Sequence, residues 1–290
     1  MSYGAKRDNS YVRIYPRRGT SIKDSDMLKT VGIIGGGNMG EALIKGLYKS
    51  HSVAVVESNV QRAAYLKKKY RVKIGAIPEV VKTSSVIVLA VKPQDMVMVL
   101  DNIVRAISNR PYGPLFISIA AGLTTKFFEK FLESARVIRC MPNMPALIGQ
   151  GITGLCAGKN AKASDIKIAQ EILKTVGQTV VVKESAIDAI TAVSGSGPAY
   201  VFLLVECWMK AAQSLGLKEA EAKALVYQTL LGSAHLLEQS SFTAGELRTK
   251  VTSKGGTTQA AMDVFFKGKL DQLIKQALSA AQRRAKELSK

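Results

Sequence analysis

A glycine motif between a strand pattern and a helix pattern constrains the fold of this chain more than any other feature. The stretch TVGIIGGGNMGEALIKGLYKS, residues 30–50, begins as a short apolar run and continues as an amphipathic helix pattern. Between them lies G-x-G-x-x-G, with glycines at Gly35, Gly37 and Gly40. The first glycine permits a tight turn, the second lets the backbone approach a pyrophosphate, and the third allows close packing of helix on strand. Because a helix N-terminus also offers free N–H groups to an anion, the sequence predicts a dinucleotide site.

Further apolar runs alternate with helical patterns before residue 184, and only helical patterns follow. The alternation predicts parallel crossovers and an α/β fold, with a Rossmann-type doubly wound parallel sheet followed by an all-helical dimerisation domain. A nearly all-round apolar helix over 199–209 suits a dimer interface. We therefore expect a flexible basic extension over 1–29, a Rossmann domain over 30–184 and a helical dimerisation and substrate domain over 185–290. The first expected strand lies in TVGIIGGG, residues 30–37, and runs into the glycines. The other expected strands are residues 52–57, 85–93, 115–122, 136–142 and 179–184.

Composition narrows the function classes. The net charge is +19, but lysines and arginines are spread along the whole chain without a nucleic-acid-binding motif, so we expect a basic surface that attracts anionic metabolites and no nucleic-acid partner. Three cysteines and two histidines are too few and too scattered for a metal site or a disulfide framework. We expect no apolar run of the sequence to be long enough to span a bilayer. We therefore expect a cytoplasmic protein without a membrane partner.

The residues after the second expected strand give conflicting signals about the cofactor. Glu57 stands where an acid would accept the ribose 2′-OH of NAD. Ser58, Asn59 and Arg62 follow it and could instead hold the 2′-phosphate of NADP. At the same sheet edge, the small residues of VKP (91–93) and AAG (120–122) would let a nicotinamide approach the backbone, although tight packing would also explain them.

The segment VTSKGGTTQAAM, residues 251–262, contains no His, Cys or carboxylate. The GGTT sequence at a helix start predicts a nest of backbone N–H groups that holds a small carboxylate, with hydroxyls to orient a neighbouring nitrogen or oxygen. Hydride transfer to an already protonated C=N bond needs positioning and one hydrogen bond. Taken alone, the segment also fits an ordinary capped helix.

Several motifs occur together in one order: GIIGGGNMGEAL, LAVKPQ, SIAAGLT, VIRCMPNMPA, VSGSGPAYVF and SKGGTT. From about Val31 to the C-terminus they closely resemble the pyrroline-5-carboxylate reductase family, which makes proline by NAD(P)H reduction of a cyclic imino acid. The resemblance implies a Rossmann domain and a helical domain that builds homodimers, often assembled into a larger ring such as a decamer. It implies pyrroline-5-carboxylate as substrate and NAD(P)H as cofactor, with NADPH slightly favoured.

The resemblance also implies site residues. The substrate would be bound by Glu184, Ser253, Thr257 and Thr258, and the Thr258 hydroxyl would act as the catalytic group near the imine nitrogen. The cofactor would contact loops from four strands. Those cofactor residues are Ile34, Gly35, Gly36, Gly37, Asn38, Met39 and Gly40 around the phosphates, Glu57 and Ser58 at the ribose, and Ala90, Val91, Lys92, Pro93 and Ala120 beside the nicotinamide.

The sequence departs from the usual family pattern at two positions, and two alternative functions remain. Lys254 replaces a usual Pro and Met144 a usual Thr. Lys254 would either add a charge beside the carboxylate nest or loosen a turn that proline stiffens. One alternative is a Rossmann reductase of another small imino or hydroxy acid, for which Lys210 and Lys218 are the candidate catalytic lysines. The other is a non-catalytic paralogue that senses a cofactor or binds nucleic acid.

Overall fold

The computed structural model describes residues 30–107 and 113–289, so the expected extension over 1–29 lies outside the described residues. The chain separates into two compact units. The sheet unit comprises the described residues of Met1–Gly195 and Gln282–Lys290, and the helical unit comprises Ser196–Ala281. The two units describe compactness, and the expected domain boundary near residue 184 stays a prediction.

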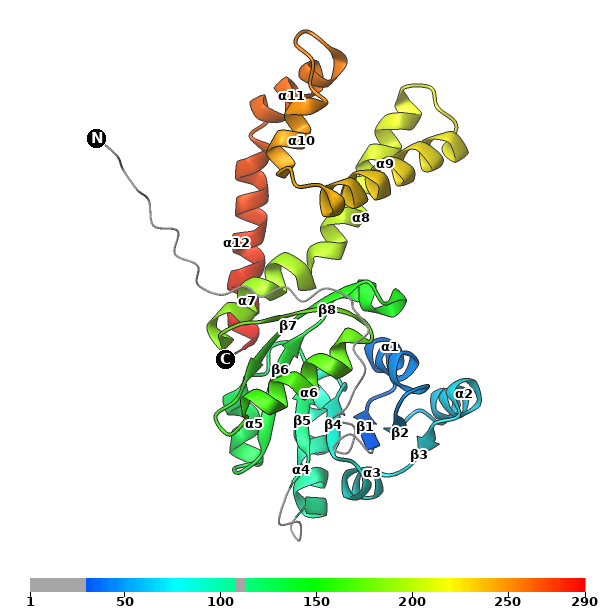
Figure 1. Ribbon diagram of the computed structural model, residues 1–290, viewed down its shortest axis with the longest axis vertical. Coiled ribbons are helices and arrows are strands. Elements are labelled where there is room, and N and C mark those ends of the chain that lie inside the picture. The colour runs from blue at the N-terminus through cyan, green and yellow to red at the C-terminus, as the bar shows by residue number, and fades with distance from the viewer. Residues whose placement is uncertain (1–29, 108–112, 290) are drawn as a thin grey trace, which may run out of the picture. The chain divides into compact units, whose positions relative to one another are not determined.

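The sheet unit is built on one eight-stranded sheet in the order β3-β2-β1-β4-β5-β6-β7-β8 (Figure 1). Every neighbouring pair is parallel except β6 and β7, which run antiparallel. The order reverses between β1 and β4, as in a doubly wound fold. The strands are β1 Thr30–Ile34, β2 Ser52–Val56, β3 Lys73–Ile74, β4 Val86–Leu89, β5 Leu115–Ser118, β6 Arg136–Met141, β7 Gly151–Ala157 and β8 Gly177–Val181.

Helices cover both faces of this sheet. Alternate residues of β1 point to opposite faces, so Ile33 packs with α1, α2 and α6 while Ile34 packs with α3, α4 and α5. Burial on both faces explains why the central strands are continuous apolar runs rather than alternating ones. The helices of this layer are α1 Asn38–Leu47, α2 Val60–Tyr70, α3 Ile77–Thr83, α4 Met96–Ile107, α5 Thr125–Phe131 and α6 Ala163–Lys174.

Two strands were not predicted from the sequence. β3 has only two residues, too few to make a pattern. β7 contains Gly151 and Gly154, which interrupt its apolar run, and both positions are sterically confined: a Cβ at Gly154 would lie 2.5 Å from a methyl carbon of Ile190. The antiparallel β6–β7 pair is the one departure from the expected parallel sheet. The Rossmann-type fold class itself is confirmed.

After β8 the described chain is entirely helical, as expected. Pro198 lies in the first turn of α8, the position that its fixed φ and missing N–H favour. The preceding VSGSG stretch contains a π-helical turn over Thr191–Gly195. The elements are η3 Glu184–Ala186, α7 Ile187–Ile190, η4 Thr191–Gly195, α8 Gly197–Ser214, α9 Glu219–Gln239, α10 Ala244–Lys250, α11 Thr257–Lys267 and α12 Leu270–Leu288.

One helical segment of the described chain, Glu184–Ser214, is long and apolar enough to cross a membrane by length and composition. The prediction that no run has this property was therefore wrong. Only 6% of its apolar window is buried within the described chain. A single such helix is weak evidence for a membrane span, because a helix that pairs with another protein surface has the same composition.

Candidate functional site

The loops predicted to bind the cofactor lie at one edge of the sheet, beyond the carboxyl ends of β1, β2, β4 and β5. Backbone hydrogen bonds extend the ladder into these loops: Gly35 N–H donates to Val56 O at 2.9 Å, and Ala90 N–H donates to Ile34 O at 2.8 Å. Ile119 N–H donates to Leu89 O at 3.1 Å, which brings the Ala120 loop to the same edge. Ligands of open α/β sheets bind at such a point, where the strand order reverses.

The glycine loop has the geometry that a pyrophosphate needs. Gly35 has φ +105°, and a Cβ there would lie 2.7 Å from the Ala90 carbonyl carbon. A Cβ at Gly40 would overlap the Gly35 carbonyl oxygen, whereas one at Gly37 would meet nothing within 4 Å. Gly37 is the N-cap of α1, and no side chain caps that helix. The N–H groups of the first turn, from Asn38 onward, are therefore open to an anion, so the loop fits a dinucleotide.

The residues at the ribose end are already engaged with the glycine loop. Gly36 N–H donates to Glu57 Oε2 at 2.8 Å, and Arg62 Nε donates to Gly36 O at 2.8 Å. Asn59 N–H donates to Glu57 Oε1 at 2.8 Å, while Ser58 is exposed. Glu57 and Arg62 therefore bind the two peptide groups on either side of the Gly36 Cα. The acid and the cation that gave conflicting cofactor signals in the sequence both contact the glycine loop.

Glu184 lies in the sheet unit, where its carboxylate is held by α5 and β6. It accepts hydrogen bonds from Thr125 N–H at 2.7 Å, Thr125 Oγ1 at 2.6 Å and Arg139 Nη1 at 3.1 Å. Burial alone would raise the pKa of this carboxyl, but the bonds from Thr125 and Arg139 outweigh burial and lower its pKa. Both oxygens already accept hydrogen bonds within the unit, so the substrate contact implied by the family stays a prediction.

Arg139 is a buried cation that the sequence analysis missed. Its side chain is 4% exposed, and besides Glu184 it faces Asp188 at 3.7 Å. Arg139 lies inside the apolar strand β6, and 45 residues separate it from Glu184 in the sequence. No local sequence pattern could therefore have predicted this ion pair. The buried cation and its two carboxylates fix the start of the helical segment that leaves β8.

Ser253, Thr257 and Thr258 belong to the helical unit. Gly256 N–H donates to Ser253 O at 3.1 Å, and Gly255 has φ +72°, so residues 253–256 form a turn with Lys254 at its second position. The turn leads into α11, which begins at Thr257 as expected. No side chain caps this helix, and Thr258 is half-buried. The first-turn N–H groups of α11 are therefore not capped by a side chain, and the carboxylate nest expected at Thr257 and Thr258 stays a prediction.

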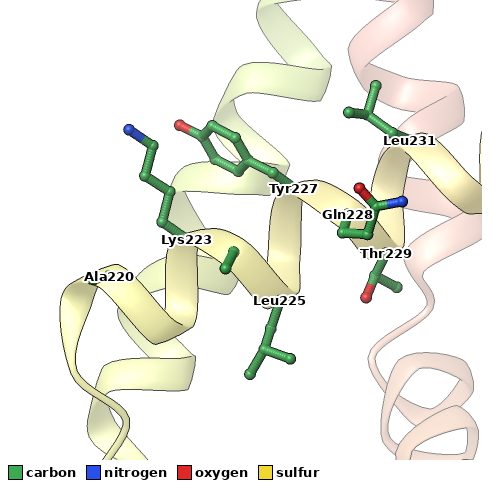
Figure 2. A pocket seen from close by; sticks show the side chains of 8 residues that line it. Ala220, Lys223, Leu225, Tyr227, Gln228, Thr229 and Leu231 are labelled. Atoms are coloured by element: carbon green, nitrogen blue, oxygen red, sulfur yellow. The ribbon is translucent and has the colours of Figure 1, made fainter.

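The pocket on α9 has a different character (Figure 2). It is lined by residues of α9 alone, from Ala220 to Leu231. Lys223 and Tyr227 point to one side of the helix and Leu225 to the other. The Lys223 ammonium lies 5.7 Å from the centroid of the Tyr227 ring. The lining is mainly apolar and does not converge on charged groups that could orient a small substrate, so this surface suits a protein contact better.

Among the described residues no group of three or more His, Cys, Asp and Glu side chains could hold a metal ion. The three cysteines are unbonded to one another.

Comparison with known proteins decides the family. Residues 184–288 match the model described as pyrroline-5-carboxylate reductase dimerisation, and residues 30–122 match the model described as NADP oxidoreductase, coenzyme F420-dependent. A pyrroline-5-carboxylate reductase of Synechocystis sp. is 39% identical over 266 residues, covering 90% of this chain and 98% of that protein. The chain belongs to the pyrroline-5-carboxylate reductase family. The family resemblance inferred from the motifs is thereby confirmed.

Other members of the family agree in sequence and in structure. The pyrroline-5-carboxylate reductase of Mycobacterium tuberculosis is 37% identical over 283 residues, covering 89% of this chain and 96% of that one. The reductase structure from Coxiella burnetii has a TM-score of 0.85 at 36% identity, covering 91% of this chain and 100% of that chain. The Plasmodium falciparum pyrroline carboxylate reductase, solved with NADP bound, has a TM-score of 0.79 at 29% identity, covering 91% and 98%.

Proposed function

We propose that this chain reduces L-1-pyrroline-5-carboxylate to L-proline with NAD(P)H, the last step of proline biosynthesis. The observation that carries the proposal is the open glycine loop at the sheet edge, in a chain that spans nearly the full length of its reductase relatives. When bound, the cofactor supplies the hydride for the C=N carbon. The rest of the chemistry is positioning, for which the N-termini of α1 and α11, neither of them capped by a side chain, are available.

The sheet unit holds the cofactor in this proposal. The N–H groups from Gly37 to Gly40 face the pyrophosphate, and Glu57 and Ser58 lie at the ribose. Ala90–Pro93 and Ala120 flank the nicotinamide. Ala120 is 5% exposed, so small side chains there bring the backbone close to the ring.

The helical unit holds the substrate in this proposal. The first-turn N–H groups of α11 bind the substrate carboxylate, and the turn at Ser253 presents them. The protonated imine nitrogen donates a hydrogen bond to the Thr258 hydroxyl, which orients the C=N bond for attack. Because the imine arrives protonated, no His or carboxylic acid is needed in this segment.

Substitution of Thr258 tests this assignment. Thr258→Val keeps the shape and removes the hydroxyl, and we expect kcat to fall by about a hundredfold. Thr249→Val is the matched control, because its exposed hydroxyl donates only to the Gly245 carbonyl of its own helix, at 3.0 Å. Unchanged kcat in Thr258→Val would exclude Thr258 from the reaction.

A homodimer through the helical unit, repeated in a larger ring such as a decamer, is part of the same proposal. It is supported by the family match and by the apolar surface that α8 exposes within the described chain. Burial of such a surface stabilises an obligate interface. The large apolar side chains that α8 exposes include Val201, Phe202, Leu203, Leu204 and Trp208. A cytoplasmic location is also proposed, since unpaired cysteines are typical of a reducing compartment.

The structure does not favour the alternative reductase of hydroxy acids. Lys210 is exposed and pairs with Glu206 at 2.6 Å. The hydrogen bond that the Lys210 ammonium donates to this carboxylate raises the pKa of Lys210, the opposite of what a lysine base needs. Lys218 precedes α9, where its backbone N–H donates to Glu221 Oε2 at 2.9 Å. Oxidation of NADPH by a 2-oxo acid in place of the cyclic imine would favour that alternative.

A further inference from the structure

A cluster of four α2 side chains surrounds one carboxylate just after the glycine motif. Glu41 follows Gly40 directly and lies in the first turn of α1. Its Oε1 accepts hydrogen bonds from Tyr70 Oη at 2.7 Å, Tyr65 Oη at 3.0 Å and Lys69 Nζ at 3.1 Å. Its Oε2 accepts from Arg62 Nη2. None of the sequence motifs singled out Glu41, and its partners are 21 to 29 residues away.

Glu41 is a permanent negative charge in this position. Its side chain is 18% exposed. Burial alone would raise the pKa of the carboxyl, but the hydrogen bonds from Tyr70, Lys69, Arg62 and Tyr65 outweigh burial and lower its pKa to about 2. The carboxylate is therefore ionised at every pH at which a dinucleotide would be reduced.

Arg62 joins this carboxylate to the glycine loop. Its Nε donates to Gly36 O at 2.8 Å while Nη2 is paired with Glu41. Its side chain remains 29% exposed. The N–H of the same residue, Gly36, donates to Glu57 Oε2. Arg62 is thus a cation at the ribose end of the cofactor edge, where an arginine can accommodate a 2′-phosphate, but its charge is shared with Glu41.

We propose that Glu41 determines cofactor specificity: by pairing with Arg62 it keeps a negative charge beside the place of a 2′-phosphate, which weakens the preference for NADPH and retains NADH as a cofactor. The inference rests on the proposed function only in requiring that the chain binds NAD(P)H. NADPH differs from NADH by the 2′-phosphate, which carries close to two negative charges. The charge of Glu41 therefore repels NADPH more than NADH, and the difference falls with distance and with salt.

A purely structural role for the cluster gives a different result. The hydrogen bonds of Glu41 also connect α1 to α2, and their loss would disturb the glycine loop, to which both cofactors bind. Both dissociation constants would then rise by the same factor. The ratio of the two dissociation constants separates the roles, because only a charge effect at the 2′-position changes it.

The test is a titration of the purified full chain with NADPH and with NADH, followed by nicotinamide fluorescence and without any imino acid. For Glu41→Gln, which keeps the shape and loses the charge, we expect the ratio Kd(NADH)/Kd(NADPH) to rise by about three- to tenfold at low salt. The rise is expected to shrink at high salt. Glu171→Gln is the matched control, because it removes the same charge from an exposed position of α6. Its ratio is expected to equal that of the unmodified chain.

Arg62→Gln gives an independent reading if Glu41→Gln does not fold. It removes the cation, and we expect it to weaken NADPH about tenfold more than NADH. A Glu41→Gln ratio that is unchanged or shifted towards NADH overturns the proposal, as does an equal loss of both cofactors in Arg62→Gln. Reduction of pyrroline-5-carboxylate is measured in parallel: binding of both cofactors without reduction refutes the proposed function and leaves the specificity test valid.

Discussion

The third glycine of the motif offers a sharp test of how packing positions the cofactor loop. Gly40→Ala adds a Cβ that would overlap the Gly35 carbonyl oxygen, far inside the 3.0 Å at which real Cβ contacts begin. Because the obstacle is backbone and not the end of a flexible side chain, β1 and α1 must separate by about 1 Å to relieve it. The loop that carries the anion-binding N–H groups must move with them.

Two effects of known size follow from that shift. A displacement of about 1 Å in a binding constellation costs on the order of a hundredfold, so dinucleotide affinity is expected to fall by about that factor. Overpacking of the α1–β1 contact is expected to lower the free energy of unfolding by about 1–3 kcal/mol.

Gly37→Ala separates these two effects. A Cβ at Gly37 meets nothing within 4 Å, so stability is expected to stay within about 0.5 kcal/mol of the unmodified chain. The new methyl would stand at the N-terminus of α1, where a pyrophosphate approaches, so affinity for both cofactors is expected to fall. Urea unfolding and fluorescence titration measure the two quantities, with the open position Gly113→Ala as control. A Gly40→Ala chain with unchanged stability and unchanged affinity would refute the argument from packing.

Two further predictions concern stability. Because the pKa values of Glu41 and Glu184 lie below 4.5 in the fold, these carboxylates stabilise it fully above about pH 4.5, and their contribution is lost as pH falls through the folded values, about 2 for Glu41. Glu41→Gln is therefore expected to lose less urea resistance than the unmodified chain between about pH 5 and about pH 3, and an equal loss would contradict the assignment. Lys254 stands at the second position of a turn whose third residue, Gly255, has φ +72°, the arrangement that favours proline at the second position. Lys254→Pro is expected to stabilise the chain by about 0.4–1 kcal/mol, measured by thermal unfolding, and a loss of stability would contradict this description of the turn.

Local patterns predicted the parts of this molecule that obey local rules. The glycine loop, the start of α11 at Thr257 and the position of Pro198 were predicted because each depends on backbone conformation and free N–H groups within a few residues. The strands of the parallel core were predicted because burial on both faces makes them continuous apolar runs. Because these strands were expected to run parallel, the sequence also predicted that their carboxyl ends lie at one edge of the sheet, where a cofactor would bind.

Long-range pairing accounts for what the sequence did not predict. β7 was missed because its glycines make an irregular apolar pattern and its antiparallel pairing with β6 has no signal of its own. Arg139 inside an apolar strand gave no hint of Glu184, and Glu41 gave no hint of Arg62, because the partners meet only through the fold. The expectation that no apolar run is long enough to span a bilayer was wrong, whereas the expected absence of a membrane partner stays a prediction. The composition of the segment Glu184–Ser214 does not reveal whether another protein surface or lipid covers it.

The most direct test of the central claim is oxidation of NADPH and NADH, in parallel, by the purified chain given pyrroline-5-carboxylate, with proline measured as the product. The account predicts turnover that depends on the cyclic imine, with one proline formed for each cofactor oxidised. Binding of either cofactor without formation of proline would contradict it.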